Sequence, residues 1–306
     1  MRWKFILTLI FIVLVVGLLV VYWFIPYNTI DFGATSGNYN FNSGDNNDTT
    51  GMQFYKNMRF PESNISYRIN DCNIQKLNEM EEAFEIIANS TVLEFYPVNF
   101  EEEISITCDS DVKVEGNLFI AGEGGPTNIT QLENYNLILH GQILLIKNSN
   151  CQRPNIAIHE LLHVLGFDHS ENSNNIMYPI SKCKQVIGED TIYLINELYS
   201  VPSYPDIVFE NISAVMHGKY LDVNLSMRNN GFKKSPTSQI FIYADDKFVE
   251  AVTLEQLDPG YGKIIMLTNH IILKLNIKEL RFVINTDFEE LNKTNNELNL
   301  KLNNSN

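Results

Sequence analysis

The chain has 306 residues, and its 37 acidic side chains outnumber the 22 basic ones, for a formal net charge of −15. This acidic balance favours a soluble surface and argues against nucleic-acid binding, because a protein that contacts phosphates needs a basic surface. We therefore expect no nucleic-acid partner.

The first segment with a clear physical character is Phe5–Ile25, which contains 21 residues and no charge. A helix needs about 20 apolar residues to cross a bilayer. The segment ends in bulky aromatic residues, which suit a membrane interface better than a signal-peptidase site. Basic residues precede it and acidic ones follow it. We predict a cytoplasmic stub at 1–4 and a transmembrane signal anchor at 5–25, in a single-pass protein of the cell membrane with its remaining domains extracytoplasmic. A cleaved signal peptide is the alternative.

The next residues offer little to bury. Asp31–Thr50 is rich in Asn, Gly, Ser, Asp and Thr, a composition typical of flexible tethers. We predict that 26–58 is a flexible linker.

From residue 59 the pattern becomes that of a folded domain. Ile65–Ile69 alternates as a strand, Asn73–Asn89 has a helical period, and Phe95–Val98 and Ile104–Thr107 alternate again. Together with two later helices, this order predicts a mixed α+β domain.

One short run carries most of the chemical information. His159–His169 reads H-E-x-x-H-x-x-G-x-x-H. His159 and His163 are four residues apart, so they lie one turn apart on the same helix face and can reach one ion. Gly166 can adopt the left-handed conformation that ends a helix and brings His169 back as a third ligand. The spacing predicts a single zinc site with these three histidines as ligands.

The same helix also has an apolar stripe. It consists of Ile158, Leu161, Leu162 and Leu165, which is the pattern of an ordinary core helix. The stripe lies to one side of the histidine face, so the helix can pack by one side and bind zinc by the other.

Three neutral imidazoles leave the full charge on the zinc and a fourth position for water. That charge acidifies the water and polarises a bound peptide carbonyl. Glu160 follows the first ligand and is the candidate general base, taking the water's proton and passing it to the leaving amine.

These residues resemble the metzincin metallopeptidases, and most of all their matrixin branch. Ser170 follows the third histidine as it does in matrixins, and Asn175–Pro179 resembles the Met-turn. Val186–Ile192 with Leu198–Tyr199 resembles the family's final helix. The resemblance covers residues 59–202 and implies a metzincin-type zinc peptidase domain at 59–203 that acts on protein or peptide substrates.

The resemblance also implies roles for residues outside the zinc run. Met177 would form an apolar floor under the metal, and Tyr178 and Pro179 would wall the substrate pocket. In metzincins an extended peptide pairs with an exposed sheet edge. The candidate edge strand is formed by Leu118, Phe119, Ile120 and Ala121, and the glycines after it are expected to stop further pairing.

All four cysteines fall within this predicted domain: Cys72, Cys108, Cys151 and Cys183. An even number in an exported domain indicates two disulfides, although four cysteines allow three pairings. We favour Cys72–Cys108 and Cys151–Cys183, the second of which would bracket the zinc helix and the Met-turn.

After Pro205 the chain changes to short alternating runs separated by turns. This pattern predicts an all-β immunoglobulin-like sandwich at 204–306. Asn229–Gly231 and Leu257–Gly260 resemble the CARDB group of such domains, which implies an accessory role in adhesion or substrate presentation. The runs begin at Ile207, Tyr220, Gln239, Phe248, Lys263 and Leu280.

The sequence therefore favours a membrane-anchored extracytoplasmic zinc endopeptidase. The alternative is a surface adhesion or binding protein in which the same domain holds zinc without turnover. Glu160 favours the peptidase, because a binding module has no chemical need for that carboxylate.

Overall fold

The computed structural model describes residues 2–24, 29–34, 51–109, 113–115, 118–148, 151–272 and 277–302. The chain divides into two compact units. The first, called here the α/β unit, comprises Phe41–Pro205 and Asn230–Lys233. The second, called the all-β unit, comprises Met1–Asn40, Asp206–Asn229 and Lys234–Asn306.

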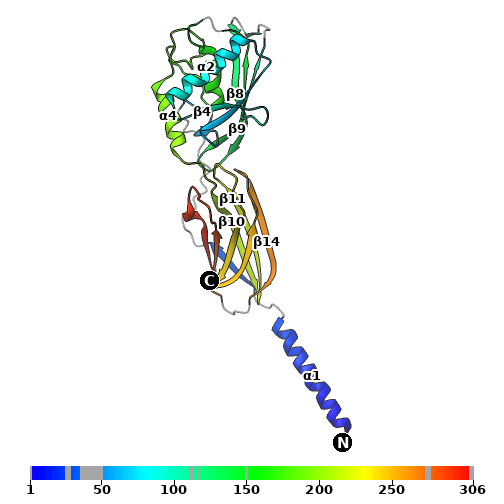
Figure 1. Ribbon diagram of the computed structural model, residues 1–306. Coiled ribbons are helices and arrows are strands. Elements are labelled where there is room, and N and C mark those ends of the chain that lie inside the picture. Colours follow the sequence, from blue (N-terminus) through cyan, green and yellow to red (C-terminus); the bar gives the residue numbers. More distant parts are fainter. Residues whose placement is uncertain are drawn as a thin grey trace. The chain divides into compact units, whose positions relative to one another are not determined.

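The α/β unit is built on one mixed sheet (Figure 1). Its parallel strands follow the order β2-β9-β5-β3-β4, and β8 pairs antiparallel with β9. Among the described strands, β8 has β9 as its only partner, so it is an edge strand. The strand bounds are β2 Met58–Arg59, β3 Asn64–Asn70, β4 Glu94–Pro97, β5 Ile104–Cys108, β8 Gly122–Gln131 and β9 Asn136–Leu145.

Helices cover this sheet and close its core. They are α2 (Ile74–Ser90), α3 (Asn155–Val164) and α4 (Glu189–Ser200). The helix α3 packs against β8, β9 and α2. The predicted helix at 73–89 is confirmed, with Asn73 as its cap: its side chain accepts a hydrogen bond from the backbone N–H of Lys76.

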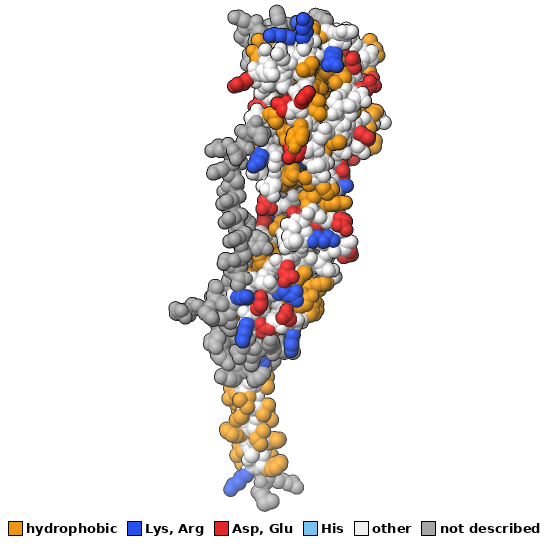
Figure 2. All heavy atoms as spheres, turned by 90° about the vertical axis from the view of Figure 1, so that its left-hand side faces the viewer, with side chains coloured by type: hydrophobic (Ala, Val, Ile, Leu, Met, Phe, Trp, Pro, Cys, Tyr) orange, Lys and Arg blue, Asp and Glu red, His pale blue; other side chains and the backbone are white. Residues whose placement is uncertain are grey.

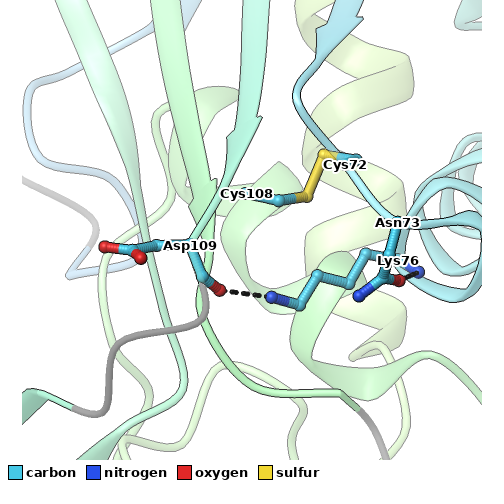
Figure 3. Close-up of a disulfide and its surroundings, with 5 residues drawn as sticks. All are labelled: Cys72, Asn73, Lys76, Cys108 and Asp109. Carbon is cyan, nitrogen blue, oxygen red and sulfur yellow. Dashed lines mark hydrogen bonds between the residues drawn. A yellow bond between two sulfur atoms is a disulfide. The ribbon is translucent and has the colours of Figure 1, made fainter.

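The first disulfide ties α2 to this sheet (Figure 3). Cys72 lies between β3 and α2, and Cys108 is the last residue of β5. The Lys76 ammonium on α2 donates a hydrogen bond to the carbonyl oxygen of Asp109, next to that cysteine. The second disulfide joins Cys151 to Cys183. Both are the favoured pairings.

The all-β unit is an eight-stranded antiparallel sheet in the order β13-β12-β15-β16-β1-β10-β11-β14. Its two edge strands approach each other at one point, where Oε2 of Glu250 on β13 lies 2.8 Å from Nδ1 of His270 on β14. Its core contains, for example, Leu225, Ile240 and Phe282, all fully buried. Its strands are β1 Thr29–Ala34, β10 Ile207–His217, β11 Tyr220–Asn229, β12 Ser238–Ala244, β13 Lys247–Leu254, β14 Gly262–Ile271, β15 Glu279–Asn285 and β16 Glu297–Leu302, with a short 3-10 helix, η1, at Lys293–Asn295.

The predicted membrane segment forms helix α1 (Arg2–Phe24). It starts three residues before the predicted span. Its window Trp3–Val20 has a mean hydropathy of 2.7 and is not buried in the protein. Hydrophobic side chains cover this helix, with a basic side chain at its end (Figure 2). Among the described residues, it is the one helix long and apolar enough to cross a membrane.

The prediction of a flexible linker at 26–58 is wrong at both ends. Thr29–Ala34 forms β1, whose neighbours in the sheet are β10 and β16. Met52–Phe54 pairs with the turn after α3. Both pairings join segments more than 100 residues apart, so local composition does not reveal them. Residues 35–50 lie outside the described residues.

Candidate metal centre

Two histidines of the predicted zinc site lie on α3. The Nε2 atoms of His159 and His163 are 3.0 Å apart, as their spacing of one turn requires. Gly166 ends the helical path with a φ of +94°, and its N–H donates to the carbonyl oxygen of His163. A residue with a β-carbon would be strained there, so glycine allows the turn.

The turn brings the third histidine to the first two. Nε2 of His169 lies 3.2 Å from Nε2 of His163, and the three ligand atoms all fall within 4.8 Å of one another. The carboxylate of Asp168 accepts a hydrogen bond from the N–H of His169, and the carbonyl of Met177 accepts one from Ser170. These two bonds hold the backbone on both sides of His169.

Backbone carbonyls fix the tautomers of the two helical histidines. Nδ1 of His159 lies 2.7 Å from the carbonyl oxygen of Ile176, and Nδ1 of His163 lies 2.7 Å from that of Phe167. A carbonyl oxygen only accepts hydrogen bonds, so both Nδ1 atoms carry the proton. Both neutral imidazoles therefore present a bare Nε2 lone pair, and these two lone pairs point into the same space.

This donor set fits zinc. Burial lowers the pKa of His159, and burial together with the charge of His159 lowers the pKa of His163 to about 4. At neutral pH the Nε2 atoms of His159 and His163 therefore carry no proton, and their lone pairs face each other. A cation bound between them would remove the repulsion. Tetrahedral coordination with bonds of about 2.0–2.1 Å places ligand nitrogens roughly 3.3 Å apart, close to the 3.0 and 3.2 Å that separate Nε2 of His163 from Nε2 of His159 and of His169. His159, His163 and His169 are the residues that would hold the ion.

Glu160 lies on the side of α3 that packs against the edge strand β8, and 6% of its surface is exposed. A β-carbon on Gly122 would lie 2.8 Å from both Cγ and Oε1 of Glu160, and one on Gly124 would overlap the carbonyl oxygen of Glu160. The two glycines therefore let the strand approach the helix closely. Burial, and to a smaller extent the charge of Glu123, raise the pKa of Glu160 to about 8.

The predicted Met-turn lies close to the histidines, since the carbonyl oxygen of Ile176 is 2.7 Å from Nδ1 of His159. Met177 is 2% exposed and belongs to the core of the α/β unit. The side chain of Asn175 accepts a hydrogen bond from the backbone N–H of Met177. Tyr178 is half-buried with the Lys182 ammonium 5.7 Å from its ring centre, and Pro179 is exposed.

The residues predicted to form the substrate edge strand do not lie at the edge of the main sheet. Leu118–Ile120 forms β7, which pairs with β6 (Lys113–Glu115) in a separate two-stranded sheet, and Ala121 follows it. The edge of the main sheet is instead the glycine-rich segment Gly122–Gln131, which was expected to stop pairing. The edge of the main sheet therefore lies one segment later than the predicted one. A glycine-rich sequence is typical of a turn, whereas in this fold two of the glycines allow β8 to pack closely on α3.

Two residues that the sequence did not single out support the site. Gln185 is 3% exposed and its amide donates to the carbonyl oxygens of Ser173 and Ile180, across the Met-turn loop. Phe54 stacks on the ring of His163. Neither residue belongs to a motif, and only the folded arrangement reveals them.

Comparison with known families agrees with this architecture. Residues 59–200 match the family model described as Matrixin, and residues 205–300 match the model described as CARDB. The first segment is matrixin-like. The second is CARDB-like and lies in the all-β unit.

Solved structures and curated proteins add less. A domain described as part of a cell surface protein from Methanosarcina acetivorans is 16% identical, covers 34% of this chain and 95% of its own, and has a TM-score of 0.28. The CARDB domain of a Pyrococcus furiosus protein, solved with di-metal ions, is 13% identical, covers 32% of this chain and 94% of its own, and has a TM-score of 0.24. No curated protein matches this chain.

Proposed function

We propose that the chain is a membrane-anchored, extracytoplasmic zinc endopeptidase. The observation that carries the proposal is the convergence of three imidazole nitrogens, two of them on the helix that also carries the buried Glu160. His159, His163 and His169 would hold the ion, and Glu160 would be the catalytic base.

The chemistry follows from these groups. When bound, the zinc would supply a Lewis acid that polarises the peptide carbonyl and acidifies water. Glu160 would accept a proton from the attacking water and return it to the departing amine, so that the carboxylate is regenerated. Its buried position against β8 holds the carboxyl group in one place for both proton transfers.

The substrate would bind along β8. This strand uses one side for β9 and lies directly against the helix that carries Glu160. An extended peptide could therefore add to its other side through main-chain hydrogen bonds. Such binding selects an extended backbone, so we propose unfolded segments or exposed loops of proteins as substrates.

The apolar helix α1 would anchor this activity at the membrane. Lys4 lies at its start and the helix has no acidic residue in its first turn, which suits an N-terminus in the cytoplasm. Both folded units would then lie outside, where disulfides such as Cys72–Cys108 persist.

The test is cleavage of a reduced, alkylated protein by the full-length chain in detergent micelles. We expect fragments from the parent, loss of cleavage with a chelator, and recovery with added zinc. Glu160→Gln keeps the shape of the side chain and should lower turnover by about 10²–10⁴-fold with zinc content unchanged. Glu197→Gln makes the same change at an exposed position of α4 and should cleave like the parent.

A parent chain that carries zinc and yet cleaves no more than Glu160→Gln would contradict the proposal. That result would favour the alternative, a surface binding protein whose metal centre does not turn over substrate.

A further inference from the structure

A short segment before the matrixin-like region packs on the metal centre from outside the family match. It consists of residues 51–58 and is called here the strap. The match begins at residue 59, so nothing in the family comparison assigns the strap a role. Its residues belong to the α/β unit.

The strap pairs with the turn that delivers the third histidine. The N–H of Phe54 donates to the carbonyl oxygen of Gly166 at 3.0 Å, and the carbonyl of Met52 accepts from the N–H of Asp168 at 3.0 Å. Gln53 forms an antiparallel bridge with Phe167 between these bonds. The backbone next to His169 is therefore held by strap residues through a small antiparallel ladder.

The strap also covers a ligand ring. Phe54 lies with its ring centre 5.7 Å from that of His163 and with 22° between the two planes. The carbonyl of Phe167, within the strap-paired turn, accepts the Nδ1 proton of His163 at 2.7 Å. The strap thus touches one ligand directly and supports the carbonyl that orients it.

The strap is itself closed into a compact loop. The side chain of Gln53, which is 5% exposed, donates to the carbonyl of Met58 and accepts from its N–H. Met58 then packs under Gly166, where a β-carbon would lie 2.7 Å from the Met58 Cβ. The loop therefore contacts the turn at both of its ends.

We propose that the strap is a positioning element of the metal centre, which holds the Gly166–His169 turn and the His163 ring in the arrangement that binds zinc. The inference rests on the proposed metal site. It implies that cleavage of the chain before Gly51 releases an ectodomain with its metal centre complete. Cleavage between Phe54 and Arg59 separates Met52 and Phe54 from the rest of the domain, so the released ectodomain should lose zinc.

The test compares Phe54→Ala with Tyr55→Ala in the full-length chain in detergent micelles. Tyr55 is the neighbouring aromatic residue and is 56% exposed, so its loss makes a similar change without touching the turn. Zinc affinity is measured by competition with a chromophoric chelator. The visible absorption of the cobalt(II)-loaded chain reports the geometry of the histidine ligands, which a general loss of stability in a still-folded protein would not alter.

We expect zinc affinity to fall about 10- to 100-fold in Phe54→Ala, the range for residues that orient metal ligands. The cobalt spectrum should change in the same variant. Tyr55→Ala should match the parent in both readouts. If Phe54→Ala does not fold, Phe54→Leu keeps the apolar bulk, loses the ring stacking and should show a smaller fall in affinity.

Equal zinc affinity and equal cobalt spectra in the parent and the folded Phe54 variant would overturn this inference and leave the proposed peptidase standing. A parent chain that binds no zinc would overturn both. Because metal binding is measured without any substrate, failure of the strap and failure of catalysis give different results.

Discussion

Nδ1 of His159 lies 2.7 Å from the carbonyl oxygen of Ile176, the residue immediately before Met177. This contact joins helix α3 to the predicted Met-turn through the imidazole itself. It fixes which nitrogen carries the proton and therefore which one is free for a metal. The loop thus orients a candidate metal ligand with its backbone.

The close approach of β8 to α3 predicts opposite outcomes for two adjacent glycines. Gly124→Ala would place its methyl group against the backbone of Glu160, whereas a β-carbon on Gly125 meets nothing within 4 Å. We expect Gly124→Ala to destabilise the α/β unit by about 1–3 kcal/mol and to lower activity. Gly125→Ala should be neutral or stabilise it by up to about 1 kcal/mol. Differential scanning calorimetry measures both, and equal transitions would contradict the packing described.

The buried Arg59 side chain predicts a large loss of stability when it is replaced. It is 2% exposed, donates to the carbonyl oxygens of Leu198 and Val201, and lies 4.4 Å from the ring centres of both Tyr199 and Phe232. Arg59→Met leaves these carbonyls without their donor, so we expect a loss of about 2–4 kcal/mol.

The control for Arg59 is a second arginine that is partly exposed. Arg68→Met removes a bridge between an arginine side chain that is 39% exposed and the Glu102 side chain, which is 8% exposed, and we expect it to cost less than Arg59→Met, about 1–2 kcal/mol. Thermal unfolding of both variants measures the difference. A loss in Arg59→Met as small as that in Arg68→Met would show that the buried guanidinium is dispensable.

The Cys151–Cys183 disulfide predicts a loss of stability when the loop that carries the three histidines is no longer closed. It closes a loop with a sequence separation of 32 residues that contains all three histidines. Replacing both cysteines by serine should destabilise the unit by roughly 3–4 kcal/mol through the regained freedom of the unfolded loop. The measurement is the unfolding temperature of the zinc-loaded chain with and without the two substitutions. An unchanged temperature would mean that the loop is held by other contacts.

The pairing of strand β1 predicts that the segment after helix α1 stabilises the all-β unit. Phe32 is paired with Ala214 on β10 and with Leu302 on β16. Proline at this position cannot donate a backbone hydrogen bond and is poorly tolerated inside a sheet. We expect Phe32→Pro to lower the stability of the all-β unit by roughly 2–3 kcal/mol, seen as a lower calorimetric transition. A transition at the parental temperature would contradict the pairing of β1.

These examples show which features local sequence could predict. The histidine spacing, the turn at Gly166 and the helix capped by Asn73 depend on neighbours a few residues away, and the structure has the helix, the turn and the clustered histidines as expected. The strands of the all-β unit from β10 to β15 follow from their alternation.

The features that sequence missed depend on distant partners. Arg59 donates to residues about 140 positions away, and β1 pairs with segments still further along the chain. The role of Gly124 requires the position of Glu160 to be known. A glycine-rich segment is predicted as a loop from sequence alone, and its strand structure follows only when the helix that packs on it is known.

The most direct measurement is the zinc content of the purified full-length chain beside two histidine variants. His169 is in the cluster, whereas His140 lies on β9 with its Nδ1 2.7 Å from the Thr127 hydroxyl, outside that cluster. We expect one zinc per chain in the parent and in His140→Ala, and none retained after dialysis in His169→Ala. A parent without zinc, or a His169→Ala chain that keeps it, would contradict the metal centre on which the proposed function depends.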